Sequence, residues 1–385
     1  MKFRISNLKS HTLPWLLLAA AGLALYAWGA PRNPPGFFID ESSVAYNAHT
    51  VSETGRDEHG EAWPLYFRAF GDYKNPTYVY LLAAVFRAAG PSVAAARYLS
   101  ASLGVLAALA LGLVGARVTG RRGAGLLTFV TALLTPWLFE LSRVVVEVAA
   151  YPLACALVLL ATRRASGKGR WGLADAGLVA GSLALVTYTY STGRLFGPML
   201  ALGLALLVTT RARVVPLLTT WALYGLTLAP LLVYHRRNPE ALTKRFSYLT
   251  YATPETSYAE DAWEFVRHFA GNLNPWRLLV TGDVNTYQIA SVPGAAPVLA
   301  AAFALALYGA WLALKSARGD AWWRFFFYAL AASVVPASLT NDYFHMLRLA
   351  ALPVFVVALA APAFARLLEG GRARRAALAL LVALA

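Results

Sequence analysis

Two adjacent carboxylates, Asp40 and Glu41, follow shortly after the apolar block 13–30. A carboxylate at a lipid–water boundary is only partly hydrated, which suits it to act as a general base. The residues that follow, Ser42 to Ser52, are predicted to form a short amphipathic helix. Capping the start of that helix is therefore the alternative role for Asp40.

A lysine marks the place where the same polar stretch returns to the membrane surface. Lys74 lies in the segment FGDYKNP and precedes a second apolar run. An ammonium group at this depth either binds a lipid phosphate or extends among the headgroups. The sequence makes Lys74 a candidate phosphate ligand and leaves the second role open.

An acidic cluster with a histidine lies between these two places. The segment GRDEHGEAW brings Asp57, Glu58, His59 and Glu61 close together. Side chains of these types can bind a metal, whereas the glycines on either side are typical of a polar turn. The sequence favours the turn and does not settle whether the cluster binds a metal.

A further polar group lies within and just after the segment LSRVVVE. Arg143 and Glu147 are four residues apart, which would put them on one face of a helix together with Tyr151. Ionisable residues near membrane depth are candidates for a functional role. A structural salt bridge between Arg143 and Glu147 is the alternative.

Three other polar groups stand at the ends of apolar blocks. Arg194 lies in TYSTGRLFGP, and Arg245 belongs to a basic group in HRRNPEALTKRF. The segment TNDYFHMLRL contains Asp342, His345 and Arg348. A helix would place His345 and Arg348 on one face, since they are three residues apart.

The elements that must carry these side chains are membrane helices. The chain has 385 residues, 58% hydrophobic and 14% charged, and its mean hydropathy is +0.53. Soluble domains have about 25% charged residues, so the composition excludes an ordinary soluble enzyme. Apolar blocks of the kind that spans a bilayer recur along the chain. They cover residues 13–30, 92–116, 123–140, 146–162, 173–190, 195–210, 214–234, 295–314, 321–339, 347–365 and 376 to the end.

Basic residues are concentrated in alternate connections between these blocks. They are Arg117, Arg121 and Arg122; Arg163, Arg164, Lys168 and Arg170; Arg211 and Arg213; Lys315, Arg318 and Arg324; Arg366, Arg372, Arg374 and Arg375. The positive-inside rule places them and the N-terminus in the cytoplasm. Among the acidic residues only Asp175, Asp320 and Glu369 fall on that side, so the chemistry is expected outside. The net charge of +15 forms no basic face that would bind nucleic acid.

This assignment decides the ambiguous run 77–90. As a helix it would be about 21 Å long against a hydrocarbon core of about 30 Å, and a crossing there would reverse every later connection. We therefore expect a juxtamembrane helix at the outer leaflet.

The predicted fold is an all-α polytopic membrane protein, a single transmembrane domain over 1–385 with about eleven spans. Two large external loops, 31–91 and 235–293, are expected to carry short juxtamembrane helices. The last apolar run ends before it is long enough to span, so we expect the chain to lack a C-terminal portion.

The order of the motifs resembles that of the GT-C glycosyltransferases, in particular family 39, which includes protein O-mannosyltransferases and lipid A aminoarabinose transferases. The matching segments are FFIDESSVAY, TGRDEHG, FGDYKNPTYVYL, AAARYLSASLG, TPWLFELSRVVVE, NPEALTKRF and HMLRLAALP. They are dispersed from residue 37 to residue 353, so the resemblance covers nearly the whole chain.

The resemblance implies transfer of a sugar from a polyprenyl-phosphate carrier to an acceptor, with inversion at the anomeric centre. Asp40, with Glu41 beside it, would be catalytic and would deprotonate or orient the acceptor. Lys74 and Arg245 would hold the departing lipid phosphate. The predicted substrate cavity consists of Arg143, Glu147, Tyr151, Arg194, His345 and Arg348. Family members usually have aspartate at the position of Glu147, which makes its role less secure. This branch requires no catalytic metal, so no metal or other cofactor is predicted.

A transporter or flippase of a polyprenyl-linked substrate is the alternative function, and a non-catalytic subunit with the same fold is a third interpretation. Transporters carry polar groups at the bilayer midplane and internal repeats. Here the acidic residues avoid the midplane, which favours an enzyme. We predict a bacterial cell-envelope transferase in the plasma (inner) membrane. Its expected partners are a polyprenyl-phosphate-linked sugar, membrane lipid and an unidentified protein, lipid or glycan acceptor.

Overall fold

The computed structural model describes residues 5–283, 292 and 294–371. The helices are α1 (Ile5–Ala27), α2 (Ile39–Thr54), α3 (Pro76–Ala89), α4 (Val93–Thr119), α5 (Arg122–Leu134), α6 (Pro136–Leu141), α7 (Tyr151–Ser166), α8 (Leu173–Thr189), α9 (Gly193–Gly203), α10 (Val214–Arg237), α11 (Lys244–Leu249), α12 (Tyr258–Asn272), α13 (Ala300–Ser316), α14 (Ala321–Ser338) and α15 (Leu352–Leu368). Short 3-10 turns are η1 (Glu147–Ala150), η2 (Leu204–Leu207) and η3 (Arg211–Arg213), and a π turn is η4 (Arg277–Thr281). Two strands, β1 (Phe67–Ala69) and β2 (Asp72–Lys74), form a hairpin.

The helices form one apolar bundle, as the hydropathy pattern predicts. Every predicted block from 13–30 to 347–365 contains a helix, and the block that begins at 376 lies outside the described residues. Three helical segments are long and apolar enough to cross a membrane, namely Val93–Thr119, Glu147–Ser166 and Arg211–Arg237. Shorter apolar helices surround them. The prediction of an all-α polytopic membrane protein is confirmed.

Helix α4 lies at the centre of this bundle and packs against α1, α5, α7 and α15. Small residues allow the closest approach. A Cβ atom on Gly125 would lie 2.7 Å from the carbonyl oxygen of Gly112, so α4 and α5 touch backbone to backbone there. Without a hydrophobic driving force between helices in lipid, such close van der Waals packing supplies much of their association.

The ion pairs of the connectors fall into two groups. The three acidic residues predicted on the cytoplasmic side each pair with a base predicted on that side. These pairs are Arg121–Glu369, Arg163–Asp320 and Arg164–Asp175. In the described part of the chain no ion pair joins this group to the acids predicted outside. The ion pairs therefore do not join the two predicted groups, and the side of the membrane that each group faces stays a prediction.

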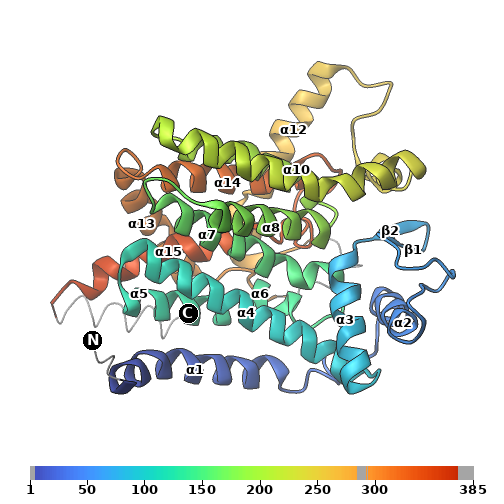
Figure 1. Cartoon of the computed structure of the whole chain (residues 1–385), viewed down its shortest axis with the longest axis horizontal. Helices are drawn as coiled ribbons and strands as arrows, with labels where there is room; N and C mark the ends of the chain where they lie inside the picture. Colours follow the sequence, from blue (N-terminus) through green and yellow to red (C-terminus); the bar gives the residue numbers. More distant parts are fainter. Residues whose placement is uncertain (1–4, 284–291, 293, 372–385) are drawn as a thin grey trace.

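The first predicted external loop carries two helices and the hairpin, which lie together at one end of the bundle (Figure 1). Helix α2 contains the predicted helix over Ser42–Ser52, and α3 covers nearly all of the run 77–90 that was predicted to be a short helix. The hairpin turns at Phe70 and Gly71, whose φ angles are 53° and 73°. Two positive φ angles define the tight turn whose twist matches paired strands. The sequence predicted no strand here.

Candidate functional site

A cavity of about 830 Å³ opens where the connectors of this end converge. Its wall is built from the segments 34–41, 144–146, 190–195, 242–249 and 336–348. The predicted site residues that line it are Asp40, Glu41, Arg194, Arg245, His345 and Arg348. The predicted residues outside its wall are Lys74, Arg143, Glu147 and Tyr151. The bundle thus brings together most of the polar clusters that are far apart in the sequence.

Strand β2 forms ion pairs with two of these clusters, one at Asp40 and one at Arg245. Lys74 Nζ lies 2.7 Å from Asp40 Oδ1, and Arg245 Nη1 lies 2.7 Å from Asp72 Oδ2. Because successive side chains of a strand point to opposite faces, Asp72 and Lys74 share one face of the hairpin. Only 13% of the Lys74 side chain is exposed, so it pairs with Asp40 rather than extending among headgroups.

Asn75, the residue after β2, binds Glu147, another acidic residue of the predicted site. Asn75 donates hydrogen bonds from its backbone N–H and from Nδ2 to the carboxylate of Glu147, with Nδ2 3.0 Å from Oε1. The positive charge of Lys74 also acts on Glu147. Glu147 therefore supports the hairpin from behind the cavity wall.

The two adjacent carboxylates have different surroundings. Asp40 is 37% exposed on the cavity wall, and within the described residues Lys74 is its hydrogen-bond and ion-pair partner. The predicted capping role for Asp40 is wrong, because Phe38 occupies the N-cap and its N–H donates to Glu41 Oε2 at 2.9 Å. Glu41 serves the helix start, which leaves the Asp40 carboxylate to the cavity.

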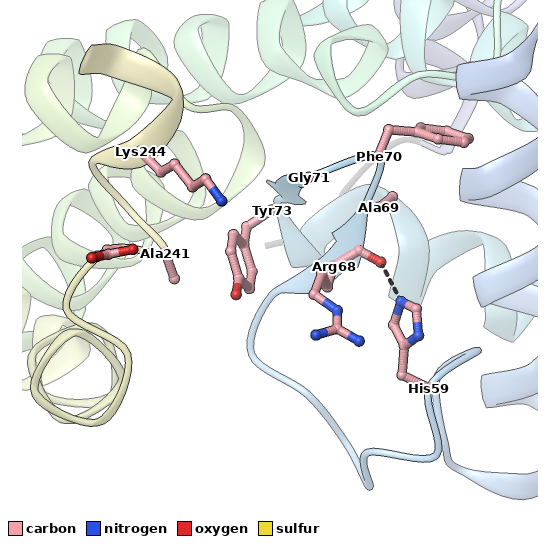
Figure 2. Close-up of a pocket in the computed structure, with 9 residues that line it drawn as sticks. His59, Arg68, Ala69, Phe70, Gly71, Tyr73, Ala241 and Lys244 are labelled. Carbon is pink, nitrogen blue, oxygen red and sulfur yellow. Dashed lines mark hydrogen bonds between the residues drawn. The ribbon is translucent and has the colours of Figure 1, made fainter. Parts of the chain in front are cut away.

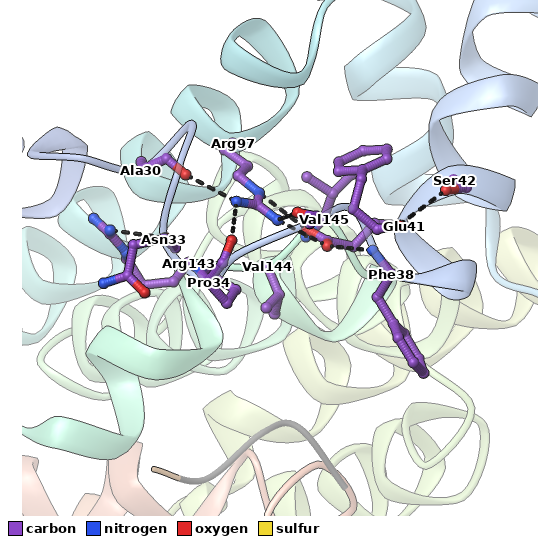
Figure 3. Close-up of polar contacts among 12 residues, drawn as sticks. Ala30, Asn33, Pro34, Phe38, Glu41, Ser42, Arg97, Arg143, Val144 and Val145 are labelled. Atoms are coloured by element: carbon purple, nitrogen blue, oxygen red, sulfur yellow. Dashed lines mark hydrogen bonds and ion pairs between the residues drawn. The ribbon is translucent and has the colours of Figure 1, made fainter. Parts of the chain in front are cut away.

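Glu41 belongs to a buried ionic network (Figure 3). It accepts hydrogen bonds from Arg97 Nε at 3.2 Å, from Arg97 Nη2 at 3.0 Å and from the N–H of Val145 at 3.0 Å. Arg97 also donates to the carbonyl oxygens of Ala30, Pro34 and Gly36. Arg97 is 0% and Glu41 2% exposed. This network fixes the connector between α1 and α2 and so positions Asp40.

Arg143 holds the same connector (Figure 3). It donates to the carbonyl oxygens of Tyr26, Trp28 and Asn33, each at 2.8 Å. The helix face predicted for Arg143 and Glu147 is wrong, because α6 ends before Arg143 and the next helical turn begins at Glu147. The alternative salt bridge between them is absent from the described ion pairs.

Two other predicted residues shape the wall. Tyr151 is buried, and its ring meets Tyr190 edge-on with centroids 5.6 Å apart. Tyr190 lines the cavity, so Tyr151 lies directly behind it. Arg194 Nη1 donates to the carbonyl oxygen of Leu242 at 3.0 Å, and its guanidinium lies over the Tyr66 ring.

The segment before α15 completes the wall. Arg348 Nη1 lies 2.7 Å from Asp342 Oδ2 and donates to Thr340 Oγ1 at 2.8 Å. The predicted helix face for His345 and Arg348 is wrong, because α15 begins only at Leu352. Burial, together with the charge of Arg348, lowers the pKa of His345 to about 3. His345 is therefore an uncharged hydrogen-bonding group at neutral pH.

Asp283, near this segment, leads to a prediction about pH. Its Oδ1 accepts from the N–H of Met346 at 2.7 Å, and burial followed by the charge of Asp342 raises its pKa to about 6. The fold therefore holds this proton up to about pH 6, whereas the unfolded chain releases it near pH 4. Above that window the ionised group destabilises the fold.

We expect Asp283→Asn to stabilise the protein at pH 7 by about 1–3 kcal/mol, because the amide oxygen still accepts from Met346 and carries no charge. The gain should shrink as the pH falls from 6 to 4. Chemical unfolding in detergent at several pH values measures it. A gain that is the same at pH 4 and pH 7 would contradict this account.

The acidic cluster with a histidine forms a polar turn. Asp57 Oδ1 accepts from the N–H groups of His59 at 2.9 Å and Glu61 at 2.8 Å. Asn47 Nδ2 donates to Glu58 Oε1 at 2.8 Å. In the described part of the chain no group of three or more His, Cys, Asp or Glu side chains is arranged to hold a metal ion. These side chains order the loop after α2.

Structural comparison places this arrangement among known proteins. No family model and no curated protein sequence matches the chain. The chain is similar to ArnT from Cupriavidus metallidurans bound to undecaprenyl phosphate, with a TM-score of 0.59, 15% identity and 95% of the chain covered. The apo state of that protein has a TM-score of 0.60 at 15% identity, again with 95% of the chain covered.

A second protein agrees with this likeness. The archaeal oligosaccharyltransferase AglB from Archaeoglobus fulgidus, in complex with an inhibitory peptide and a dolichol-phosphate, has a TM-score of 0.55 at 14% identity over 99% of the chain. Both proteins are GT-C proteins. The chain has a GT-C fold. It spans 63% and 61% of the two ArnT chains and 55% of the AglB chain.

Sequence reasoning missed three residues of this candidate site. Arg97 is a lone arginine within the apolar block 92–116, and an ionisable residue inside a span is itself a signal. Asp72 stands two residues before Lys74, a spacing that puts both on one face of a strand. Asn75 had no signal, because its role depends on where Glu147 lies in space.

Proposed function

We propose that the chain transfers a sugar from a polyprenyl-phosphate donor to an acceptor, with inversion, on the extracytoplasmic side of the plasma membrane. One observation carries the proposal. The Asp40 carboxylate lies on the wall of a large cavity beside the Lys74 ammonium, while the same strand holds the Arg245 guanidinium through Asp72. The lipid phosphates bound to ArnT and AglB, which share the fold, support a polyprenyl-linked donor.

The proposed reaction is a single displacement. An acceptor oxygen bonds to the anomeric carbon as the bond from that carbon to the phosphate oxygen breaks, which inverts the centre. Asp40 takes the proton of the acceptor. The lipid phosphate leaves with an additional negative charge, which Lys74 and Arg245 stabilise. Glu41 acts as a positioning residue, because its carboxylate is occupied by Arg97 and Val145.

The position of the polar groups supports a transferase over a transporter. Asp40 stands at the start of α2, Arg194 at the start of α9, and Arg245 at the start of α11. Transport sites lie near the bilayer midplane, often at interrupted spans. Here the cavity is formed at one end of the bundle, which we place outside, with the N-terminus in the cytoplasm.

The test is consumption of lipid-linked sugars by the purified protein in nanodiscs made from host lipids. An envelope extract supplies the acceptor, and mass spectrometry follows each lipid. We expect one polyprenyl-phosphate sugar to disappear and free polyprenyl phosphate to accumulate. Unchanged lipids, together with movement of a lipid-linked sugar across the bilayer of sealed vesicles, would favour the transporter instead.

Arg245→Ala is expected to raise the KM for the lipid donor about tenfold with a smaller effect on kcat, because one charge-assisted contact to the phosphate is lost. It also leaves Asp72 unpaired beside the donor. The double variant Arg245→Ala/Asp72→Asn should therefore recover part of the loss. Arg236→Ala, an exposed arginine outside the cavity, is the control. An unchanged KM for Arg245→Ala would exclude this contact.

A further inference from the structure

A second cavity, of about 410 Å³, lies beside the hairpin (Figure 2). It is lined by His59, by the hairpin residues Arg68, Ala69, Phe70, Gly71 and Tyr73, and by Glu240, Ala241 and Lys244. None of these residues lines the larger cavity. Nothing in the proposed reaction uses this space.

The hairpin lines the smaller cavity, and its Asp72 and Lys74 form ion pairs with two residues that line the larger one. Arg68 pairs directly with Tyr73, so both side chains stand on one face, whereas Phe67 and Ala69 are buried on the other. Lys74, whose ammonium meets Asp40, stands with the buried pair. The face with Arg68 and Tyr73 lines the smaller cavity, to which Ala69 of the other face also contributes.

The start of α11 also contacts both cavities. Lys244 lines the smaller cavity, and its neighbour Arg245 lines the larger one. A ligand in the smaller cavity would therefore lie one residue away from the proposed phosphate contact.

The cationic side chains beside the two cavities differ in whether they have ion-pair partners. Lys74 and Arg245 are both ion-paired. Within the described residues, neither the Arg68 guanidinium nor the Lys244 ammonium has a hydrogen-bond or ion-pair partner, although both are exposed to the smaller cavity. The Glu240 carboxylate is also without a partner there. Two unpaired cations facing one space are suited to bind an anionic group.

The other residues that line the smaller cavity indicate what else the ligand would contain. Figure 2 shows the side chains of Arg68, Tyr73 and Lys244 pointing into the same space. His59 Nε2 donates to the carbonyl oxygen of Arg68 at 2.9 Å, which ties the edge of the cavity to the polar turn. An aromatic face packs against the apolar face of a sugar ring, and the Glu240 carboxylate accepts hydrogen bonds from hydroxyl groups.

We propose that the smaller cavity binds an anionic saccharide, whose phosphate or carboxylate contacts Arg68 and Lys244 while its ring packs on Tyr73. If the proposed function holds, this saccharide is a part of the acceptor away from the reacting hydroxyl. Its binding energy would then help to position the acceptor in the larger cavity.

The test is direct binding, by calorimetry, of glucose 6-phosphate, glucuronate, glucose and inorganic phosphate to the wild type in nanodiscs. We expect the two anionic sugars to bind at least tenfold more tightly than glucose or inorganic phosphate. Arg68→Gln and Lys244→Gln, both at exposed positions, should each weaken that binding about tenfold. Arg236→Ala should not change it.

Three results would overturn the proposal: no binding of either anionic sugar, equal binding of inorganic phosphate, or unchanged binding by both glutamine variants. The Asp40→Asn variant separates this proposal from the proposed function, since it should bind the anionic sugars like the wild type. Binding without any lipid-sugar consumption would refute the transferase and keep the saccharide site. Lipid-sugar consumption without binding of either anionic sugar would refute the saccharide site and keep the transferase.

Discussion

Replacing Asp40 with asparagine is expected to lower kcat for sugar transfer by about 10²–10⁴-fold, the usual contribution of a positioned general base. Asparagine has nearly the same shape but cannot take the proton of the acceptor. Because Asp40 is 37% exposed and the asparagine oxygen can still accept a hydrogen bond from Lys74, the substitution should change the melting temperature little. The measurement is the initial rate of donor consumption in nanodiscs.

Glu53→Gln supplies the matched control for this experiment. Glu53 is an exposed acid near the other end of the same helix, outside both cavities. The control should keep the wild-type rate. If Asp40→Asn retains more than half of the wild-type kcat, Asp40 is not the base, and the proposed reaction must be abandoned.

Replacing Arg97 with methionine is expected to lower the free energy of unfolding by about 3–5 kcal/mol, because it leaves the buried Glu41 charge without its partner. The change also removes the donors to three carbonyl oxygens of the connector before α2. An equilibrium unfolding titration in mixed detergent micelles measures the loss. Activity should fall as well, since this connector positions Asp40.

Further variants test whether the unpaired Glu41 charge causes the loss in free energy of unfolding. Glu41→Gln also leaves a buried charge without its ionic partner, but Arg97 keeps its three carbonyl acceptors and the glutamine oxygen can still accept one N–H, so this variant should cost less than Arg97→Met. The double variant Arg97→Met/Glu41→Gln removes both charges of the buried pair and should be more stable than Arg97→Met alone. A double variant that is less stable than either single variant would show that the carbonyl contacts, not the charge, dominate.

The bundle could be predicted from hydropathy alone. A segment that spans a bilayer must be a long apolar run whose backbone hydrogen bonds form within one helix, and such runs can be recognised from the sequence. The short run that became α3 was recognised in the same way, by length and by the charge of the connectors. The resemblance to GT-C proteins rested on dispersed motifs, and the fold comparison confirms it.

The local backbone structure around the site could be predicted less well from the sequence. Spacings of three and four residues predicted helix faces for Arg143 with Glu147 and for His345 with Arg348, yet both pairs lie in irregular segments. Backbone breaks beside a cavity depend on packing from other helices, which a spacing rule does not contain. Even so, His345 and Arg348 line the cavity, because the connector as a whole lies where the sequence indicated.

The sequence by itself determined that this protein is a helical membrane bundle, and it predicted most polar clusters at the ends of the spans because polar groups are costly in lipid. Only the tertiary structure decided how the acids divide their roles. Asp40 and Glu41 are neighbours in the chain, but Arg97 reaches only Glu41, and Lys74 reaches only Asp40. Those partners come from distant segments, and their distances are set by three-dimensional packing.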